Sequence, residues 1–430
     1  MGRGTGSLAI LLTCVHIATG QQTTAPRDRE SNLQSFETVW TTVKDHYWDP
    51  QMAGIDWQTI HDEFRPKVEA AKTREEARTL IGDMLARLKQ THFGVVPSDV
   101  YRELDPSGDE SAGEATPGID LRVLDGHAVV TTVDVRSPAA ERGVKPGWQI
   151  VNINGSAIDP AIQSIRDQFA TSTLQDIRLT RSVLVRLQGA PGATVKVDFL
   201  NERDQPVTLD LARIEPRGKV VRMGNLPANH FWSEWRKVGA GIGYVRFNEF
   251  MEPDALIKTF QESVGACRDC KGFVIDLRGN PGGIGGLAMG VAGWFVDQAG
   301  LQLGTEYLRG IGPIKFVIYP RPEPFRGPLA ILVDGCSAST AEIFAGGLKD
   351  VKRARIFGTR TAGAALPSVI SKLPNGDGFQ YAIANYISQG GQPLEGIGVT
   401  PDEEIRPTRR ELLAGKDPAL DAAVNWIQKK

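Results

Sequence analysis

The sequence predicts a multidomain α/β protein with a helical N-terminal domain, a smaller β domain and an α/β core built on a mainly parallel sheet. Three observations support this fold class. The chain has 430 residues, more than a single hydrophobic core usually contains. Apolar residues recur at helical spacing up to about residue 90, and strand-like apolar runs follow from about residue 121. From about residue 239 strands and helices alternate, which is typical of a parallel sheet covered by helices.

The composition narrows the classes of function. Hydrophobic residues make up 41% of the chain and charged residues 23%, as in a water-soluble globular protein. The formal net charge of -2 provides no basic excess that could displace counterions, so we expect no nucleic-acid partner. Beyond the N-terminus no stretch approaches the roughly 20 apolar residues that a membrane helix needs. We therefore expect no integral membrane span in the mature chain.

Residues 1–20 have the order of features found in a secretory signal peptide. Arg3 precedes a short apolar segment, and the small residues Ala18 and Gly20 suit cleavage after Gly20. We therefore expect an exported protein, either periplasmic or extracellular. Lipid attachment at Cys14 is the rival interpretation, but the threonine before this cysteine fits a lipidation motif poorly.

A helical domain is expected over residues 33–100, after a flexible polar linker over residues 21–32. Apolar side chains recur every three or four positions in three successive segments, namely 36–47, 60–68 and 80–88. The third helix begins with a capping box formed by Thr73 and Glu76. It ends before the loop that contains His92.

The middle of the chain changes from helical to strand periodicity. Residues 101–116 combine acidic residues with Ser, Gly and Pro, and we expect a linker there. Residues 117–214 contain several short strand-like runs and one long helical segment, so they predict a small β domain. A second linker is expected over residues 215–238.

The α/β core is expected over residues 239–406. The apolar run 272–277 predicts a buried strand, and a glycine-rich loop over residues 278–283 follows it. Loops at the carboxyl ends of parallel strands usually face the ligand, which makes this loop a candidate for the active site. Residues 407–430 are expected to end the chain in an amphipathic helix.

Ser339 is the candidate nucleophile. The apolar run 329–333 predicts a strand, a turn follows, and helical spacing resumes at Ile343 and Phe344. The hydroxyl of Ser339 would then lie at a helix N-terminus, where free N–H groups favour a developing negative charge. Ser339 and Glu342 also fit a simple capping box, which requires no chemistry.

Four motifs extend the argument beyond this turn, and they are Asp276-Leu-Arg-Gly-Asn-Pro-Gly-Gly283, Ser337-Ala-Ser339-Thr-Ala-Glu-Ile343, Gly358-Thr-Arg-Thr-Ala-Gly363 and Gly396-Ile-Gly-Val-Thr-Pro-Asp402. In this order they resemble the C-terminal processing, or tail-specific, serine peptidases. The resemblance implies a helical N-terminal domain, a PDZ domain and a peptidase core with Ser339 as nucleophile and no chemical role for Ser337. It also implies an oxyanion hole from the backbone N–H groups of Thr340 and Gly283, with Gly282 as the alternative donor.

One position departs from the lysine-dependent members of this family. They carry a Lys directly after the last Gly of the third motif, where this chain has Ala364. Alanine cannot transfer a proton. The chain is more similar to the Ser-His-Glu branch that includes the tricorn core and the chlamydial protease-like activity factor. This resemblance implies the triad Ser339, His92 and Glu395, with His230 as the alternative base and a solvated turn as the alternative role of Glu395.

The middle domain is similar to a PDZ domain. The resemblance places its carboxylate-binding loop at Gly118, Ile119, Asp120 and Leu121, although Asp120 stands where that family often has Gly. PDZ domains bind a peptide as an added strand. A structural β domain without a ligand is the alternative interpretation.

The cysteines give no sign of a metal site. Cys267 and Cys270 could form a small disulfide in an exported protein or remain free thiols, and a zinc site would need two further ligands nearby. We expect neither a metal nor an organic cofactor.

Together these patterns predict an exported serine endopeptidase. It would cleave unfolded or C-terminally exposed polypeptides through an acyl-enzyme, so its expected partners are polypeptide substrates. An inactive PDZ-containing peptide-binding protein is the first alternative, and a serine hydrolase that acts on small esters is the second. The oligomeric state does not follow from the sequence.

Overall fold

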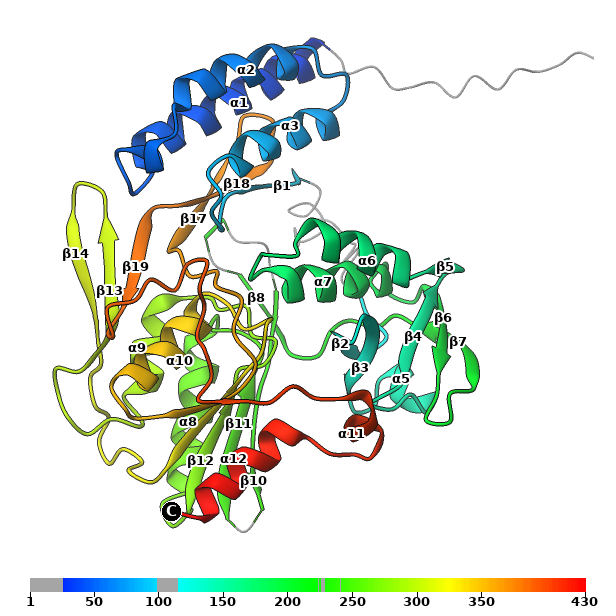
Figure 1. Ribbon diagram of the computed structural model, residues 1–430, viewed down its shortest axis with the longest axis vertical. Helices are drawn as coiled ribbons and strands as arrows, with labels where there is room; N and C mark the ends of the chain where they lie inside the picture. Colours follow the sequence, from blue (N-terminus) through cyan, green and yellow to red (C-terminus); the bar gives the residue numbers. More distant parts are fainter. Residues whose placement is uncertain (1–25, 99–114, 223, 226–228, 240) are drawn as a thin grey trace, which may run out of the picture.

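A computed structural model describes residues 26–98, 115–222, 224–225, 229–239 and 241–430 of the chain (Figure 1). The expected signal segment 1–20 lies outside the described residues, and so do residues 101–114 of the expected linker 101–116, whose last two residues form isolated bridges to Gly189 and Ile214. The linker expected over 21–32 differs from the structure, because helix α1 already begins at Pro26. No helix in the described part of the chain combines the length and the apolar character needed to cross a bilayer.

The N-terminal helices are α1 (Pro26–His46), α2 (Trp57–Glu69) and α3 (Arg74–Ala86), with a short 3-10 turn, η1 (Met52–Gly54). Thr73 caps α3 as expected and accepts from the N–H of Glu76, whose own carboxylate accepts from the Lys72 N–H. Asp56, for which no cap was expected from the sequence, accepts hydrogen bonds from the first turn of α2. The apolar faces pack together around Phe36, Phe64 and Met84. A hairpin from the distant core completes this cluster, because Leu373 and Phe379 also belong to it.

That hairpin connects the helical part to the core. It consists of β17 (Ser368–Lys372) and β18 (Gly378–Ala382), and the short strand β1 (Gly94–Val96) pairs antiparallel with β18. Figure 1 shows the orange hairpin reaching up to the blue helices. Because β1 begins two residues after His92, its pairing with β18 fixes the position of this candidate base relative to the core.

The middle β unit contains an antiparallel sheet in the order β2-β3-β4-β6-β7, with β5 paired to β4. Its strands are β2 (Ile119–Leu124), β3 (His127–Val133), β4 (Gln149–Ile153), β5 (Ser156–Ala157), β6 (Thr194–Leu200) and β7 (Pro206–Ala212). Its helices are α5 (Pro138–Glu141), α6 (Asp159–Gln168) and α7 (Gln175–Leu187). Strand β2 forms an edge of this sheet, and α7 packs against it.

The core sheet has the order β10-β11-β12-β15-β16-β20. Its strands are β10 (Ser233–Val238), β11 (Ile242–Phe247), β12 (Gly272–Asp276), β15 (Leu329–Val333), β16 (Arg355–Gly358) and β20 (Glu403–Glu404). The sheet is mixed rather than mainly parallel as expected, since β10 runs antiparallel to β11 while the other neighbours are parallel. A hairpin connection of three residues between β10 and β11 permits only the antiparallel pairing.

Helices cover both faces of this sheet. Helices α8 (Pro253–Ala266), α9 (Gly285–Ala292) and α10 (Thr340–Asp350) pack on one face, where Phe273, Ile275 and Ile331 point. Helix α12 (Pro418–Gln428) covers the other face, where Val274 and Leu332 point. Burial on both faces explains why these strands are continuous apolar runs rather than alternating ones.

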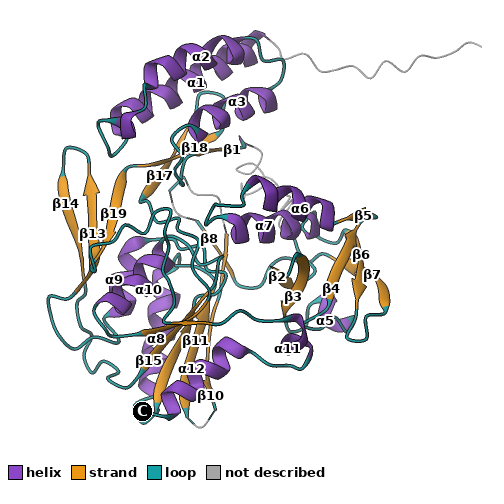
Figure 2. Cartoon of the chain, in the orientation of Figure 1, coloured by secondary structure: helices purple, strands orange, loops and turns teal. Residues whose placement is uncertain are grey.

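Smaller strands complete the fold. A second sheet joins β13 (Gln302–Leu308), β14 (Gly312–Val317) and β19 (Ala384–Ser388). The expected linker 215–238 differs from the structure, since it contains β10 and the paired strands β8 (Lys219–Val221) and β9 (Asn229–Phe231). The expected C-terminal helix is α12, and the short helix α11 (Arg409–Leu413) precedes it (Figure 2). Gly415 separates the two with a positive φ of 68°, which ends α11.

Candidate active site

Ser339 lies in a sharp turn between β15 and α10. Its backbone has φ 54° and ψ -120°, a conformation that side-chain-bearing residues rarely adopt. Hydrogen bonds made by the side chains of Asp334 and Ser337 hold the turn in place. Asp334 accepts from the N–H of Cys336 at 3.0 Å, and the Ser337 hydroxyl donates to the carbonyl of Leu277 at 2.7 Å. The strained turn therefore presents the half-buried Ser339 at the N-terminus of α10.

The glycine-rich loop lies directly against this turn. A Cβ atom at Gly282 would come within 2.7 Å of both the Ser339 Cβ and the Thr340 nitrogen, so only glycine fits there. The carbonyl of Gly283 accepts from the Thr340 hydroxyl at 2.7 Å. Buried Asn280 fixes the loop, because its side-chain oxygen accepts from the Gly282 N–H at 2.9 Å. The expected oxyanion-hole residues Gly283 and Thr340 are therefore direct neighbours.

His92 and Glu395 lie on either side of Thr91. The Thr91 hydroxyl is 2.7 Å from His92 Nδ1 and donates to Glu395 Oε2 at 2.9 Å. The Thr91 N–H donates to the other oxygen of Glu395 at 2.7 Å. Sequence reasoning missed Thr91. Its position between a catalytic candidate and the polar end of a helix was the only available signal, and such threonines are common.

The same carboxylate connects this group to the nucleophile turn. Glu395 Oε2 accepts from the N–H of Ala365 at 3.1 Å, and the neighbouring Ala364 carbonyl accepts from the Ser339 N–H at 2.8 Å. Contacts thus run from Ser339 through two alanines to Glu395, and from there through Thr91 to His92.

Burial sets the charge states of these groups. Desolvation lowers the pKa of His92 to about 4, so its imidazole is neutral at pH 7. Burial also raises the pKa of Glu395, although hydrogen bonds from Thr91 and Ala365 oppose that effect. A neutral imidazole beside a hydrogen-bonded carboxyl group suits a general base.

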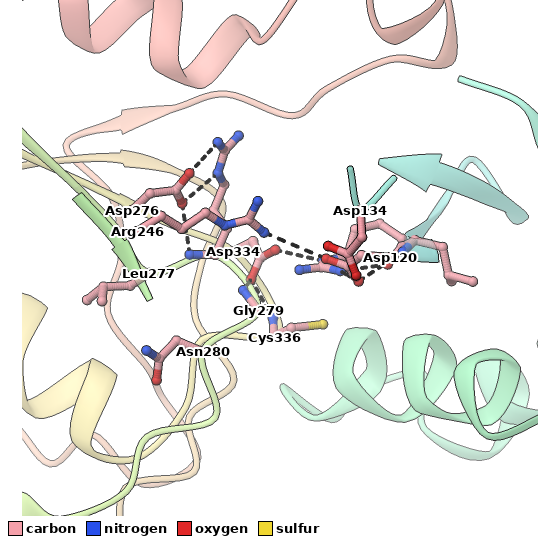
Figure 3. Close-up of polar contacts among 12 residues, drawn as sticks. Asp120, Asp134, Arg246, Asp276, Leu277, Gly279, Asn280, Asp334 and Cys336 are labelled. Carbon is pink, nitrogen blue, oxygen red and sulfur yellow. Dashed lines mark hydrogen bonds and ion pairs between the residues drawn. The ribbon is translucent and has the colours of Figure 1, made fainter. Parts of the chain in front are cut away.

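The middle β unit packs against both loops of the candidate site. Arg122 on β2 donates to Asp334 at 2.7 Å and to Asp120 at 2.8 Å. Asp334 also accepts from the Gly279 N–H at 2.9 Å (Figure 3). Although burial opposes ionisation, Arg122 and this N–H hold the pKa of Asp334 below its ordinary value. A cavity of about 300 Å³ lies between β2, α7 and the core, and Trp232 is among the residues that line it.

The expected carboxylate-binding loop is partly occupied by its own side chain. Leu121 donates its N–H to the Asp120 carboxylate at 2.9 Å, at a register shift between the two residues. Gly118 donates to the Thr116 hydroxyl, and Ile119 pairs with Val133 on β3. The Asp120 carboxylate therefore stands where a peptide carboxylate would compete for the Leu121 amide.

The remaining candidates lie apart from these contacts. His230 belongs to β9, where its carbonyl accepts from the Asn248 side chain. Cys267 and Cys270 form a disulfide at the end of α8. Among the described residues no group of three or more His, Cys, Asp or Glu side chains could hold a metal ion.

Two parts of the chain match known protein families. Residues 241–405 match peptidase family S41, and residues 28–86 match the tricorn protease C1 domain. The chain carries an S41 peptidase domain. It is a serine-type peptidase, as its resemblance to the C-terminal processing enzymes implied. The S41 match contains Ser339, the glycine-rich loop and Glu395, whereas His92 lies beyond both matches.

Individual relatives extend the similarity over most of the chain. A carboxyl-terminal-processing protease of Picosynechococcus is 27% identical over 380 residues, which cover 85% of this chain and 81% of that protein. Tricorn protease homolog 1 of Streptomyces coelicolor is 26% identical over 412 residues, or 91% of this chain. That match spans only 34% of the Streptomyces protein, so the chain corresponds to about a third of it.

Solved structures share the fold. The photosystem II D1 C-terminal processing protease superposes with a TM-score of 0.58 at 24% identity, covering 90% of this chain and 98% of that one. Mature CPAF complexed with lactacystin superposes with a TM-score of 0.62 at 14% identity, covering 94% of this chain and 98% of that one.

Proposed function

We propose that this peptidase is an exported endopeptidase that cleaves unfolded or C-terminally exposed polypeptides through an acyl-enzyme on Ser339. The observation that carries the proposal is the set of contacts that joins His92, Thr91 and Glu395 and continues through Ala365 and Ala364 to the Ser339 turn. The names of the relatives support the substrate class, since several are carboxyl-terminal-processing proteases. The sequence of residues 1–20 supports export.

The hydrogen-bond pattern supports one direction of proton transfer. The single hydroxyl proton of Thr91 is donated to Glu395, so the Thr91 oxygen accepts from Nδ1–H of His92. His92 Nε2 then carries the free lone pair. It takes the proton of Ser339 as the hydroxyl oxygen attacks the scissile carbonyl, and it returns that proton to the leaving amine. Water then attacks the ester by the same route in reverse.

The backbone N–H groups of Gly283 and Thr340 would stabilise the tetrahedral intermediate. Both residues lie beside Ser339, and the positive end of α10 favours negative charge there. Ala364 contributes no proton transfer, so the imidazole has to supply the basicity that a lysine provides in other members.

The middle β unit would act as the PDZ domain of this peptidase. Strand β2 lies at the edge of its sheet, where an extended polypeptide can add, and there it would replace the bonds that Leu121 makes to the Asp120 and Arg122 side chains. Its position beside the nucleophile turn and the glycine-rich loop supports a role in bringing substrate to the active site.

The test is hydrolysis of an unfolded protein and of a peptide panel by the purified chain and by Ser339→Ala, His92→Ala and Glu395→Gln. We expect losses of at least about a thousandfold for Ser339→Ala and His92→Ala. Circular dichroism would confirm that each variant folds, and Ser156→Ala, on the exposed strand β5, is the matched serine control away from the nucleophile turn.

Three results would contradict the proposal in different ways. Unchanged hydrolysis by Ser339→Ala would exclude the serine mechanism. Binding of C-terminal peptides without any turnover would support the inactive peptide-binding alternative. Turnover of small esters with no cleavage of any polypeptide would support the esterase alternative.

A further inference from the structure

Glu342 forms a buried junction that the proposed mechanism does not use. Its side chain is fully buried in the first turn of α10 and lies between the nucleophile turn and residues 361–365, which we call the alanine segment. One oxygen accepts from the N–H groups of Ser339 at 3.0 Å and Ala364 at 2.9 Å. The other accepts from the Gly363 N–H at 2.8 Å and the Thr361 hydroxyl at 2.5 Å.

All four partners act as donors, which matches an ionised carboxylate. A carboxylate only accepts, and its two oxygens offer about four lone-pair sites. A proton on the oxygen that faces Ser339 and Ala364 would meet two backbone N–H groups. A proton on the other carboxylate oxygen would require the Thr361 hydroxyl to turn away and accept instead of donate. The hydroxyl oxygen of Thr361, however, already accepts from the Val399 N–H at 2.6 Å. Protonation therefore breaks up the junction whichever oxygen receives it.

The alanine segment makes this junction relevant to catalysis. The last residue of the segment, Ala365, donates its N–H to Glu395, and Glu395 in turn accepts from Thr91 beside His92. Glu342 thus lies between the nucleophile and the group that orients the base, without contacting any reacting atom.

We propose that Glu342 is a positioning residue whose ionised carboxylate holds Ser339 in register with the His92–Glu395 group, and that its protonation switches acyl transfer off in mildly acidic surroundings. The proposal rests on the proposed serine mechanism. It adds a control by pH that resides in the nucleophile turn and not in the base.

The electrostatic surroundings agree with this role. Burial raises the pKa of Glu342 to about 7, against the four hydrogen bonds, which lower it. The titratable groups of the neighbouring segments are Glu395 on the far side of Ala365, and Asp334 and Cys336 in the nucleophile turn. The main causes of the Glu342 shift are its burial and its own hydrogen bonds. Because burial lowers the pKa of His92 to about 4, protonation of Glu342 and protonation of His92 would affect the rate in different pH ranges.

The experiment measures the rate at which a fluorophosphonate probe labels Ser339 between pH 4.5 and pH 8.5. The serine oxygen forms a bond to phosphorus, fluoride leaves, and the serine proton passes to the base. For the wild-type chain we expect the rate to fall about tenfold per pH unit below about 7, with one proton involved. Glu342→Gln should lose this dependence between pH 5 and 8 and label about 10- to 100-fold more slowly at pH 8.

The matched control is Glu411→Gln. Glu411 occupies the same position in the exposed capping box of α11, so its variant should keep the wild-type profile. An acid limb that persists in Glu342→Gln would overturn the proposal. If that variant does not fold, Thr361→Val serves instead, because the loss of this hydroxyl should raise the midpoint of the wild-type limb. A midpoint that stays or falls would overturn the proposal equally.

Thermal melting separates positioning from a merely structural role. Since the pKa of Glu342 is raised in the folded state, the stability it contributes is fully present below about 4.5 and is lost as the pH rises through about 7. Acid should therefore stabilise the wild-type fold relative to Glu342→Gln while it abolishes labelling. A wild-type chain that loses stability relative to the variant between pH 8 and pH 5 would contradict the proposal.

The same experiments distinguish the two proposals. If the probe labels Ser339 and the wild-type chain and Glu342→Gln share one pH profile, the serine mechanism stands and the proposed role of Glu342 fails. If no labelling occurs at any pH and Ser339→Ala matches wild type, the proposed function fails, and the melting data alone decide whether Glu342 titrates.

Discussion

Thr91 shows how one hydroxyl group can organise the candidate active site. It donates to the Glu395 carboxylate and lies 2.7 Å from His92 Nδ1, so in the proposed mechanism it determines which ring nitrogen of His92 carries the proton. The carboxylate of Glu395 is held in turn by two backbone N–H groups, those of Thr91 and Ala365. The orientation of the base therefore depends on a residue with no acid–base chemistry of its own at neutral pH.

We predict that Thr91→Val lowers kcat of peptide hydrolysis by about 10- to 100-fold, since losing a hydrogen bond to a charged group costs about 1.5–3 kcal/mol. Thr91→Ser keeps the hydroxyl and should retain most of the activity. Steady-state kinetics of the two variants provide the measurement. Equal losses in both variants would show that the methyl group of Thr91 matters rather than its hydrogen bonds.

The hairpin of β17 and β18 is the element that brings the two ends of the site together. It leaves the alanine segment, enters the N-terminal helical cluster and pairs with β1 next to His92. Its tip is anchored by Asp377, which is fully buried and accepts hydrogen bonds from Nε and Nη2 of Arg78, both at 2.8 Å. Although burial opposes ionisation, Arg78 and the Ser98 N–H keep the pKa of Asp377 below its ordinary value.

We predict that Arg78→Met destabilises the helical part by about 3–5 kcal/mol, because it leaves a buried carboxylate without its cation. Urea denaturation followed by tryptophan fluorescence measures the effect. The double variant Arg78→Met/Asp377→Asn should recover part of the loss, since it also removes the charge. Arg65→Met breaks half-exposed ion pairs with Glu37 and Glu69, and it should change the stability by less than about 1 kcal/mol.

A charged network joins the middle β unit to the core beside the candidate site. The helical part supplies His92, the core supplies Ser339 and Glu395, and the middle β unit supplies Arg122. This arginine reaches Asp334, which fixes the amides of Gly279 and Cys336 in the two catalytic loops. A shift of the middle unit would thus reach both loops through one side chain (Figure 3).

We predict that Arg122→Gln speeds amide hydrogen exchange at Gly279 and Cys336 by about tenfold or more, because the ion pair that holds Asp334 in place is lost. Exchange followed by mass spectrometry on the intact chain provides the measurement. Arg142→Gln is the control, since Arg142 is an exposed residue of the same β unit. Unchanged exchange in Arg122→Gln would mean that the catalytic loops hold Asp334 without the middle unit.

Local patterns carry the information that the sequence provides about single elements. The capping residue Thr73, the buried runs 272–276 and 329–333 and the turn before α10 could all be placed from spacing and residue type. These features depend on a few neighbouring residues, because helix caps and buried strands are decided by local hydrogen bonding and by burial. The order of motifs then indicated a serine peptidase.

Contacts between distant segments decided the rest. Thr91 and Glu395 are 304 positions apart, and Arg78 and Asp377 are 299 apart, so no local pattern reveals that they touch. The antiparallel β10 and the strands within residues 215–238 likewise depend on partners elsewhere in the fold. By itself the sequence determined the family and the class of enzyme, and it named the candidate residues for the chemistry. Only the tertiary structure decided which donors surround Glu342 and Glu395, because the charge state of a buried carboxyl group depends on everything packed around it.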